Sequence, residues 1–312
     1  MLTTSENPDD LDNAEDETDA LLAAFFGEGD NWIIFDSASP KATRALLQEI
    51  DARPNKTLGQ NFLVRGDVLD HIVQTAGVTS EDRVLEIGSG LGALTSRLAR
   101  AAKEVVAIEK DPKMCDVLGR HFRAPNFRQI CGDALDIEYS LLGLPESGVK
   151  VVANLPYGVS KPMLRLLMEQ WRPHFSSLTL MLQREVADRV VAKHSTTEYG
   201  PLAIMTQLHS TAKRVFDVKA GSFLPPPNVT SSVVHIVLRA TPAVELRDEK
   251  FFWRVVRAAF AQRRKQLTNT LRAVVSDGAL LERAFIETQI DPKRRGETLS
   301  LQEFADLSHA LL

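Results

Sequence analysis

The chain has 312 residues, 44% of them hydrophobic and 25% charged, which excludes a collagenous or a fully disordered protein. Its net charge of −4 is unevenly spread, because residues 1–40 hold 11 acidic side chains and no Lys or Arg, whereas the rest holds 30 acidic and 37 basic ones, a net charge of +7. A basic body suits a protein that binds a polyanion. No apolar run approaches the roughly 20 residues of a membrane span and the first residues are acidic, so we expect a cytoplasmic protein without a membrane segment.

Residues 1–41 are predicted to form a mostly disordered acidic extension, since their low hydrophobicity cannot offset the entropy lost on ordering. Two apolar segments within it, Leu21–Phe26 and Asn31–Phe35, are candidates for docking on the protein's own surface or on a partner. Loose tethering is the expectation for both.

From residue 42 onwards, helical and β-rich segments alternate. Helices are predicted at 67–76, 93–102, 112–122 and 162–171, and strands at 83–87, 104–109, 127–131, 150–153, 178–182 and 231–238. This alternation predicts an α/β protein with an open, mainly parallel sheet, whose ligands bind at the carboxyl ends of the strands. Beyond residue 242 the pattern is helical only, so we expect a main domain at 42–242 and a small helical domain at 243–312.

The two cysteines, Cys115 and Cys131, match neither metal-ligand nor redox-motif spacing. We expect two reduced thiols, and neither a disulfide nor a metal site.

A strand that runs into glycines and then a helix, residues 83–93, predicts a cofactor loop, because glycines let the backbone approach a ligand closely. Glu109 lies at the end of the next strand, where a carboxylate can accept both hydroxyls of a ribose. Asp133 follows the third strand, where an acid could read an adenine edge. Gly88, Gly90 and Ala93 also fit a dinucleotide fingerprint, so this region alone leaves NAD and S-adenosylmethionine both open.

The fourth predicted strand ends in Asn154-Leu-Pro-Tyr157. An adenine amine is a poor nucleophile because its lone pair is delocalised into the ring, so a catalyst must localise and aim that pair. The side-chain carbonyl of Asn154 and the backbone carbonyl of Leu155 can accept the two amine hydrogens, Pro156 fixes the turn, and Tyr157 can stack on the base.

Together, these motifs resemble the ribosomal RNA adenine dimethyltransferase family, in particular its bacterial small-subunit (16S) branch. The resemblance covers about residues 42–312 and rests on KTLGQNFL, LEIGSGLGALT, VVAIEKD, GDALD, NLPYGVS, YGPLAIMTQ and SFLPPPNVTSSVV, in that order. It implies a seven-stranded, Rossmann-like methyltransferase fold that uses S-adenosyl-L-methionine, with a small all-helical C-terminal domain. The implied reaction is dimethylation of the 6-amino groups of two adjacent adenosines in 16S ribosomal RNA of a pre-assembled 30S particle.

The resemblance also implies roles for individual residues. Phe223 should stack on the flipped adenine from the side opposite Tyr157. Gly158, where the family commonly has a larger residue, and the acidic extension depart from the family pattern. The implied cofactor-binding residues are Asn61, Leu63, Gly88, Gly90, Glu109, Asp133, Ala134 and Asn154.

Residues 250–272 hold seven basic and no acidic side chains, and their apolar residues keep helical spacing. We therefore expect a helical RNA-contacting surface there. Its predicted RNA-binding residues are Arg254, Arg257, Arg263, Arg264 and Lys265.

Three alternatives remain at this stage: an NAD-dependent oxidoreductase, a non-catalytic ribosome-assembly factor, and a large-subunit adenine methylase of the macrolide-resistance type. The C-terminal segments resemble the small-subunit branch better than the last of these. We expect a monomer.

Overall fold

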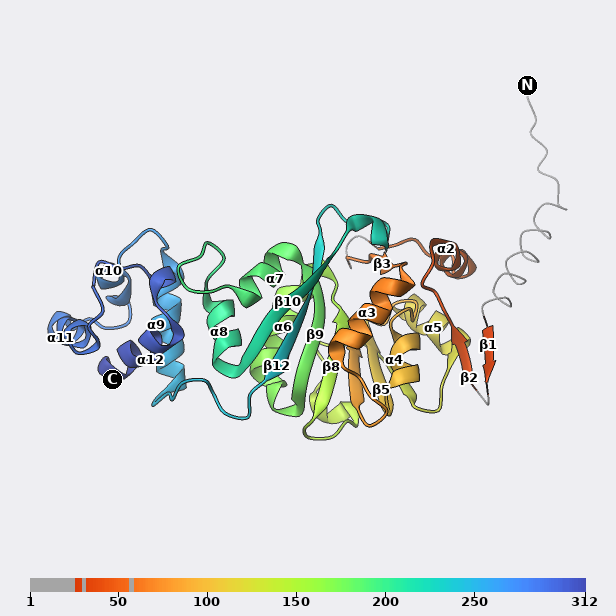
Figure 1. Ribbon diagram of the computed structural model, residues 1–312, viewed down its shortest axis with the longest axis horizontal. Helices are drawn as coiled ribbons and strands as arrows, with labels where there is room; N and C mark the ends of the chain where they lie inside the picture. The colour runs from red at the N-terminus through yellow and green to blue at the C-terminus, as the bar shows by residue number, and fades with distance from the viewer. Residues whose placement is uncertain (1–25, 30–31, 56–58) are drawn as a thin grey trace, which may run out of the picture. The chain divides into compact units, whose positions relative to one another are not determined.

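The computed structural model describes residues 26–29, 32–55 and 59–312 (Figure 1). These residues form two compact units, each built from two stretches of chain. The first unit contains the residues up to 183 together with 215–233, and the second contains 184–214 and 234–312.

A seven-stranded sheet has the strand order β10-β12-β9-β8-β4-β5-β7. In chain order its strands are β4 (Arg83–Ile87), β5 (Glu104–Glu109), β7 (Phe127–Cys131), β8 (Val149–Asn154), β9 (Phe175–Gln183), β10 (Ser210–Val218) and β12 (Ser231–Leu238). The pairs β4–β5, β4–β8, β5–β7 and β8–β9 are all parallel, so the carboxyl ends of these strands meet at one edge. The predicted α/β fold with a seven-stranded sheet is confirmed.

The central strands are buried on both faces, which explains why their sequences are almost continuously apolar. Helices α3 (Gly66–Ala76) and α4 (Thr95–Ala101) cover the face turned to the viewer in Figure 1. Helix α5 (Pro112–His121) begins where Asp111 accepts a hydrogen bond from the backbone N–H of Lys113, with a proline in its first turn. The helix predicted at 162–171 forms as α6 (Ser160–Arg165), which continues as a π-helical turn over Leu166–Gln170.

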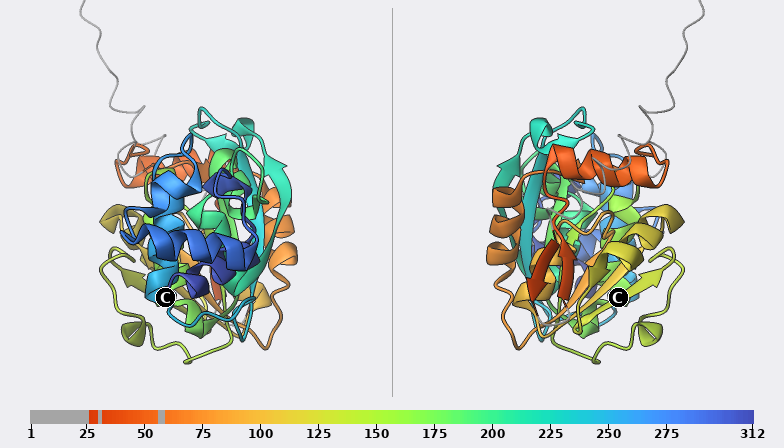
Figure 2. Two further views of the ribbon diagram at one scale, coloured as in Figure 1. Left: turned by 90° about the vertical axis from the view of Figure 1, so that its left-hand side faces the viewer. Right: turned by 90° about the vertical axis from the view of Figure 1, so that its right-hand side faces the viewer.

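Strands β1 (Phe26–Gly29) and β2 (Trp32–Phe35) form a hairpin near α5 (Figures 1 and 2), and β2 pairs antiparallel with β6 (Phe122–Arg123). Loose tethering is therefore the wrong expectation for residues 32–35. The apolar segment of the extension that precedes this hairpin lies, except for Phe26, outside the described residues. Helix α2 (Pro40–Glu49) follows, capped by the hydroxyl of Ser39.

The second unit has a core of its own, in which Tyr199, Phe252 and Phe304 are fully buried. Its helices are α7 (Arg184–Val191), α8 (Pro201–His209), α9 (Glu249–Ala261), α10 (Leu267–Leu271), α11 (Gly278–Thr288) and α12 (Leu301–Ala310). Helices at the C-terminus are as expected, and α8 contributes to the same core. The domain limits at 41 and 242 stay a prediction. None of the described helices is long and apolar enough to cross a bilayer.

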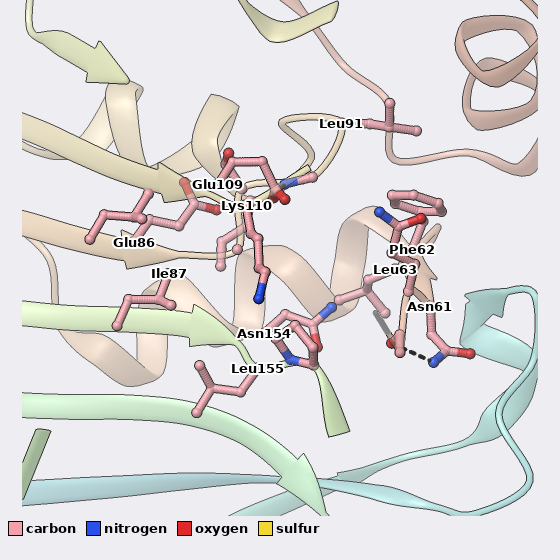
Figure 3. A pocket seen from close by; sticks show the side chains of 18 of the residues that line it. Asn61, Phe62, Leu63, Glu86, Ile87, Leu91, Glu109, Lys110, Asn154 and Leu155 are labelled. Carbon is pink, nitrogen blue, oxygen red and sulfur yellow. Dashed lines mark hydrogen bonds between the residues drawn. The ribbon is translucent and has the colours of Figure 1, made fainter. Parts of the chain in front are cut away.

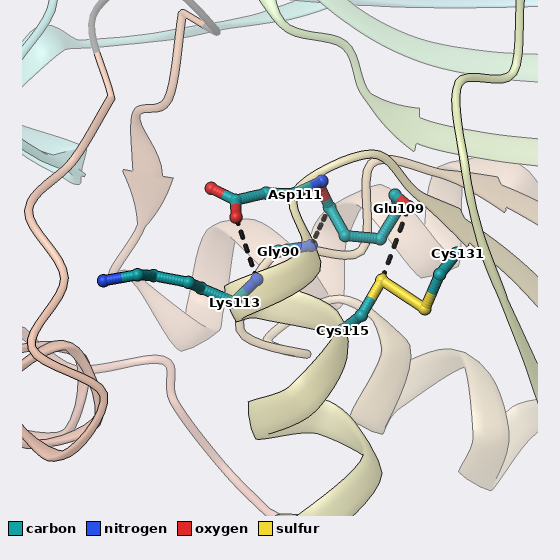
Figure 4. The surroundings of a disulfide bond; sticks show 6 residues. All are labelled: Gly90, Glu109, Asp111, Lys113, Cys115 and Cys131. Carbon is teal, nitrogen blue, oxygen red and sulfur yellow. Dashed lines mark hydrogen bonds between the residues drawn. A yellow bond between two sulfur atoms is a disulfide. The ribbon is translucent and has the colours of Figure 1, made fainter.

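Cys115 of α5 and Cys131 at the end of β7 form a disulfide bond (Figure 4). The expectation of two reduced thiols is wrong in this structure. The spacing of 16 residues carries no signal for such a bond, because only the packing of α5 on β7 brings the two Cα atoms to 6.1 Å.

Candidate active site

A cavity of about 360 Å³ opens at the carboxyl ends of β4, β5, β7 and β8 (Figure 3). This is where a parallel sheet is expected to bind its ligand. The cavity wall includes all of the predicted cofactor-binding residues: Asn61, Leu63, Gly88, Gly90, Glu109, Asp133, Ala134 and Asn154. Their individual roles stay predictions.

The glycine loop after β4 lies directly beside the segment that follows β8. Gly88 has a φ of +79°, a conformation that favours glycine, and a Cβ atom there would lie 3.7 Å from the backbone oxygen of Asn154 and 3.6 Å from Cδ of Pro156. Gly90, with a φ of +52°, would bring a Cβ atom within 3.4 Å of the Phe62 ring. The loop thus keeps its backbone open to the cavity, and it joins the predicted cofactor site to the predicted substrate site.

Glu109 ends β5 with its carboxylate held by the backbone. Its Oε2 accepts a 2.8 Å hydrogen bond from the N–H of Gly90, and its Oε1 accepts one of 2.8 Å from the N–H of Asp111. Burial raises the pKa of Glu109, while these backbone hydrogen bonds act in the opposite direction. The side chain has one fixed orientation, suited to accepting further hydrogen bonds from ribose hydroxyls.

Asp133 lies in the loop after β7 and forms an ion pair with Lys110. Its Oδ1 also accepts a 3.0 Å hydrogen bond from the N–H of Leu135. Burial alone would raise the pKa of Asp133, but the hydrogen bonds from Lys110 and Leu135 hold it below the ordinary value. The group is therefore an ionised acceptor at neutral pH.

Glu86 is an acid within an otherwise apolar strand, and the sequence analysis missed it. Only 1% of the residue is exposed, and neither carboxyl oxygen has a hydrogen-bond partner among the described residues. Desolvation, with a smaller contribution from the charge of Glu109, raises the pKa of Glu86 to about 8, although the nearby hydroxyl of Thr95 acts to lower it. Because Glu86 also lines the cavity (Figure 3), it is available to a cationic group of a ligand. The signal that could have found it is the single charged residue inside the buried strand segment Val84–Ile87.

The predicted catalytic segment lies on the same wall. Asn154 ends β8, and the N–H of Leu155 donates a 3.3 Å hydrogen bond to the carbonyl of Met181 in the neighbouring strand. The hydroxyl of Tyr157 lies 2.6 Å from Oγ of Ser231, which fixes the ring's orientation. Asn154, Leu155, Pro156 and Tyr157 all line the cavity, so the structure brings the predicted catalytic segment and the predicted cofactor residues together.

Phe223 is placed differently. It lies in β11 (Phe223–Leu224), which pairs antiparallel with β3 (Phe62–Leu63), so that Phe223 is opposite Leu63. It is 3% exposed and packs in the core with Leu63 rather than on the cavity wall. Stacking of this ring on a substrate base stays a prediction.

The predicted RNA-binding residues all lie in the second unit and are exposed. Arg254 and Arg257 belong to α9. The basic triplet Arg263, Arg264 and Lys265 lies in the turn between α9 and α10, so the helical spacing of residues 250–272 is divided between two helices. In this turn the guanidinium of Arg263 donates a 2.6 Å hydrogen bond to the carbonyl of Thr197.

Comparison with known proteins identifies the family. The family described as ribosomal RNA adenine dimethylase matches residues 52–311. The chain belongs to this family. The resemblance based on seven motifs is thereby confirmed, and the fold class, the enzyme class and the use of S-adenosylmethionine follow from membership.

Two relatives carry the name ribosomal RNA small subunit methyltransferase A. The protein from Clostridium acetobutylicum is 42% identical over 267 residues, which cover 85% of this chain and 96% of that protein. The protein from Bacillus mycoides is 44% identical over 287 residues, which cover 89% and 98%. Among solved structures, a dimethyladenosine transferase from Plasmodium falciparum has a TM-score of 0.68 at 26% identity, covering 79% of this chain and 95% of that one. The 23S rRNA methyltransferase ErmE has the same fold, with a TM-score of 0.62 at 24% identity over 80% of this chain and 99% of its own.

Proposed function

We propose that this protein transfers methyl groups from S-adenosylmethionine to the 6-amino groups of two adjacent adenosines in 16S ribosomal RNA during ribosome biogenesis. The observation that carries the proposal is the common cavity wall formed by the Asn154–Tyr157 segment, Glu109 and the glycine loop. The names of the relatives from Clostridium acetobutylicum and Bacillus mycoides favour small-subunit over large-subunit RNA.

The wall residues fit S-adenosylmethionine. Asp133 can read the adenine edge, Glu109 can hold the ribose hydroxyls, and the backbone at Gly88 leaves room for the methionine part. The buried carboxyl of Glu86, which has no partner among the described residues, suits the ammonium of the amino-acid tail. When bound, the cofactor supplies an electrophilic methyl group on its sulfonium.

The protein's own residues prepare the adenine amine. The base leaves its stack and enters the cavity beside Tyr157, whose ring is held by Ser231. The side-chain oxygen of Asn154 and the backbone oxygen of Leu155 accept the two amine hydrogens, so that the nitrogen lone pair points at the methyl group. Each transfer leaves S-adenosylhomocysteine as the other product and releases one proton from the amine nitrogen to water, so the amine keeps one N–H after the first transfer for a second. Phe223 is proposed to stack on the opposite face of the base.

Binding of the RNA is assigned to the second unit. Arg254, Arg257 and the basic triplet are exposed cations that can neutralise phosphates without reading sequence. We further propose a monomer that acts in the cytoplasm on a pre-assembled 30S particle.

The test is incubation with labelled S-adenosylmethionine and unmethylated small ribosomal subunits, followed by mass spectrometry of the RNA nucleosides. The expected product is 6-dimethyladenosine from small-subunit RNA, with none from large subunits run in parallel. Transfer to large subunits alone would replace the proposal by the macrolide-resistance activity. Cofactor binding without transfer to either subunit would replace it by an assembly role.

A further inference from the structure

The chain segment before residue 52, where the family match begins, supplies part of the cavity wall. Ser37 and Thr43 line the cavity, and both precede that match. Ser37 lies just before helix α2, and Thr43 lies within it. Residues before the family-model match therefore contribute to the wall of the proposed cofactor site.

Ser37 is fixed in place from both sides. The carboxylate of its neighbour Asp36 forms two hydrogen bonds with the guanidinium of Arg97, of 2.9 and 3.0 Å. Burial would raise the pKa of Asp36, but the contacts with Arg97 and Ala38 lower it, so the pair is ionised. The carbonyl of Ser37 accepts a 2.8 Å hydrogen bond from the hydroxyl of Thr43. The backbone of Ser37 therefore has little freedom to move.

The side chain of Ser37, by contrast, has no partner in the part of the chain that the structure describes. Its hydroxyl is buried without a hydrogen bond to any described residue, and only 1% of the residue is exposed. The hydroxyl of Ser89, in the glycine loop, is in the same condition and lines the same cavity. Leaving a buried hydroxyl without a partner is destabilising, so each of these two hydroxyls on the cavity wall is suited to bond a polar group of a ligand.

The contacts of Arg97 indicate which end of the cavity Ser37 occupies. Arg97 belongs to α4, directly after the glycine loop, and it also bonds to the carbonyl of Ala93 and to Asp70 of α3. Asp133 follows β7, which lies two strands away from β4 in the sheet. Ser37 therefore lies at the glycine-loop end, away from the residue assigned to the adenine.

Apart from Glu86 and Asn154, the other polar side chains of the described wall are already engaged. Lys110 is the one cation among the described lining residues, and it is paired with Asp133 at the adenine end. The amide nitrogen of Gln60 donates to Asp111 at 2.7 Å, and that of Asn61 donates to the carbonyl of Gly59 at 3.0 Å. Of the hydroxyl groups on the described wall, those of Thr43 and Tyr157 are also bonded, which leaves the hydroxyls of Ser37 and Ser89.

We propose that the hydroxyl of Ser37, together with that of Ser89, donates hydrogen bonds to the carboxylate of the cofactor's methionine part. An anionic group at this end has no lining cation to pair with, so neutral donors must satisfy it. The ammonium of the same amino-acid tail then faces the carboxyl of Glu86. This inference rests on the proposed function and extends its cofactor site to a residue that precedes the family-model match at 52–311.

The experiment compares two ligands that differ in the tail. S-adenosylhomocysteine has the amino-acid carboxylate, whereas 5′-methylthioadenosine has only the adenosine and a thioether. Calorimetry of Ser37→Ala should give a dissociation constant for S-adenosylhomocysteine at least about 10-fold weaker than that of the wild type, because a hydrogen bond to a charged group is lost. Binding of 5′-methylthioadenosine should change less than about 2-fold, since that ligand does not reach Ser37.

Ser39→Ala is the matched control, because it removes a hydroxyl two residues away that caps α2 and does not line the cavity. It should leave the affinities for both ligands unchanged. An unchanged affinity of Ser37→Ala for S-adenosylhomocysteine overturns the inference, as does an equal loss for both ligands or the same loss in Ser39→Ala. If Ser37→Ala does not fold, Ser89→Ala must show the ligand-selective loss. A wild-type protein that binds neither ligand overturns the proposed function itself.

Discussion

Glu86 offers a quantitative test of the site's electrostatics in the absence of any ligand. The carboxyl ionises near pH 4.5 in the unfolded chain, whereas desolvation and Glu109 raise its pKa to about 8 in the folded protein. Below pH 4.5 the carboxyl is protonated in both the folded and the unfolded state, so it does not change the free energy of unfolding. As the pH rises from 4.5 towards 8, the unfolded state releases its proton and the folded state does not, so the free energy of unfolding falls.

At 1.36 kcal/mol for each pKa unit, this loss is about 2 kcal/mol at pH 6 and levels off near 5 kcal/mol above pH 8. Glu86→Gln removes this pH-dependent loss. The free energy of unfolding of the variant minus that of the wild type should therefore increase by about 3 kcal/mol between pH 6 and pH 9. Urea unfolding followed by circular dichroism at several pH values measures the difference, and any fixed effect of the amide cancels. Glu81→Gln, at an exposed position, is the control and should show no such trend. A difference between Glu86→Gln and wild type that stays constant across pH would refute the assignment of a buried, raised-pKa carboxyl.

Three further predictions concern catalysis, RNA binding and the disulfide. Asn154→Ala removes an acceptor for the amine and no phosphate contact, so methyl transfer to small subunits should fall at least about 100-fold while filter binding of the RNA stays near wild type; wild-type turnover would exclude the proposed role. Replacing the basic triplet with Gln should weaken RNA binding and reduce the slope of log affinity against log salt concentration by up to about 3. An unchanged slope would mean that the RNA binds to another surface. Reduction of the bond between Cys115 and Cys131, checked by thiol alkylation and mass spectrometry, should lower the free energy of unfolding by about 3 kcal/mol, as expected for a loop of this length. Two alkylatable thiols before any reductant is added would contradict the bond.

The sheet was predictable from the sequence because its strands are buried on both faces. Largely apolar runs with sharp ends predict the limits of β4, β5 and β12 as the structure has them. Strand β10 was not predicted, since exposed charged residues such as Lys213 and Arg214 break its pattern. The apolar residues of 250–272 keep a helical spacing on both sides of the basic triplet, although the backbone forms a turn there. The sequence pattern therefore does not reveal the break between α9 and α10.

The site was predictable wherever its residues sit in local motifs at strand ends, as with Glu109, Asp133 and Asn154. Contacts between distant segments left no comparable signal. Nothing in the sequence near Asp36 relates it to Arg97, and the disulfide partners are joined only by the packing of α5 on β7. Phe223 is the reverse case. A local motif predicts that its ring stacks on the substrate base, but the structure places the ring in the core.

The two backbone hydrogen bonds to Glu109 have a consequence for how fast a ligand can bind. Because the N–H groups of Gly90 and Asp111 already orient the carboxylate, folding rather than binding removes its rotational freedom. A ribose that reaches this point meets a rigid, preorganised acceptor and requires no rearrangement of the loop. Capture of the cofactor should therefore be a single concentration-dependent step, and differences in affinity among its analogues should reside in how quickly they leave.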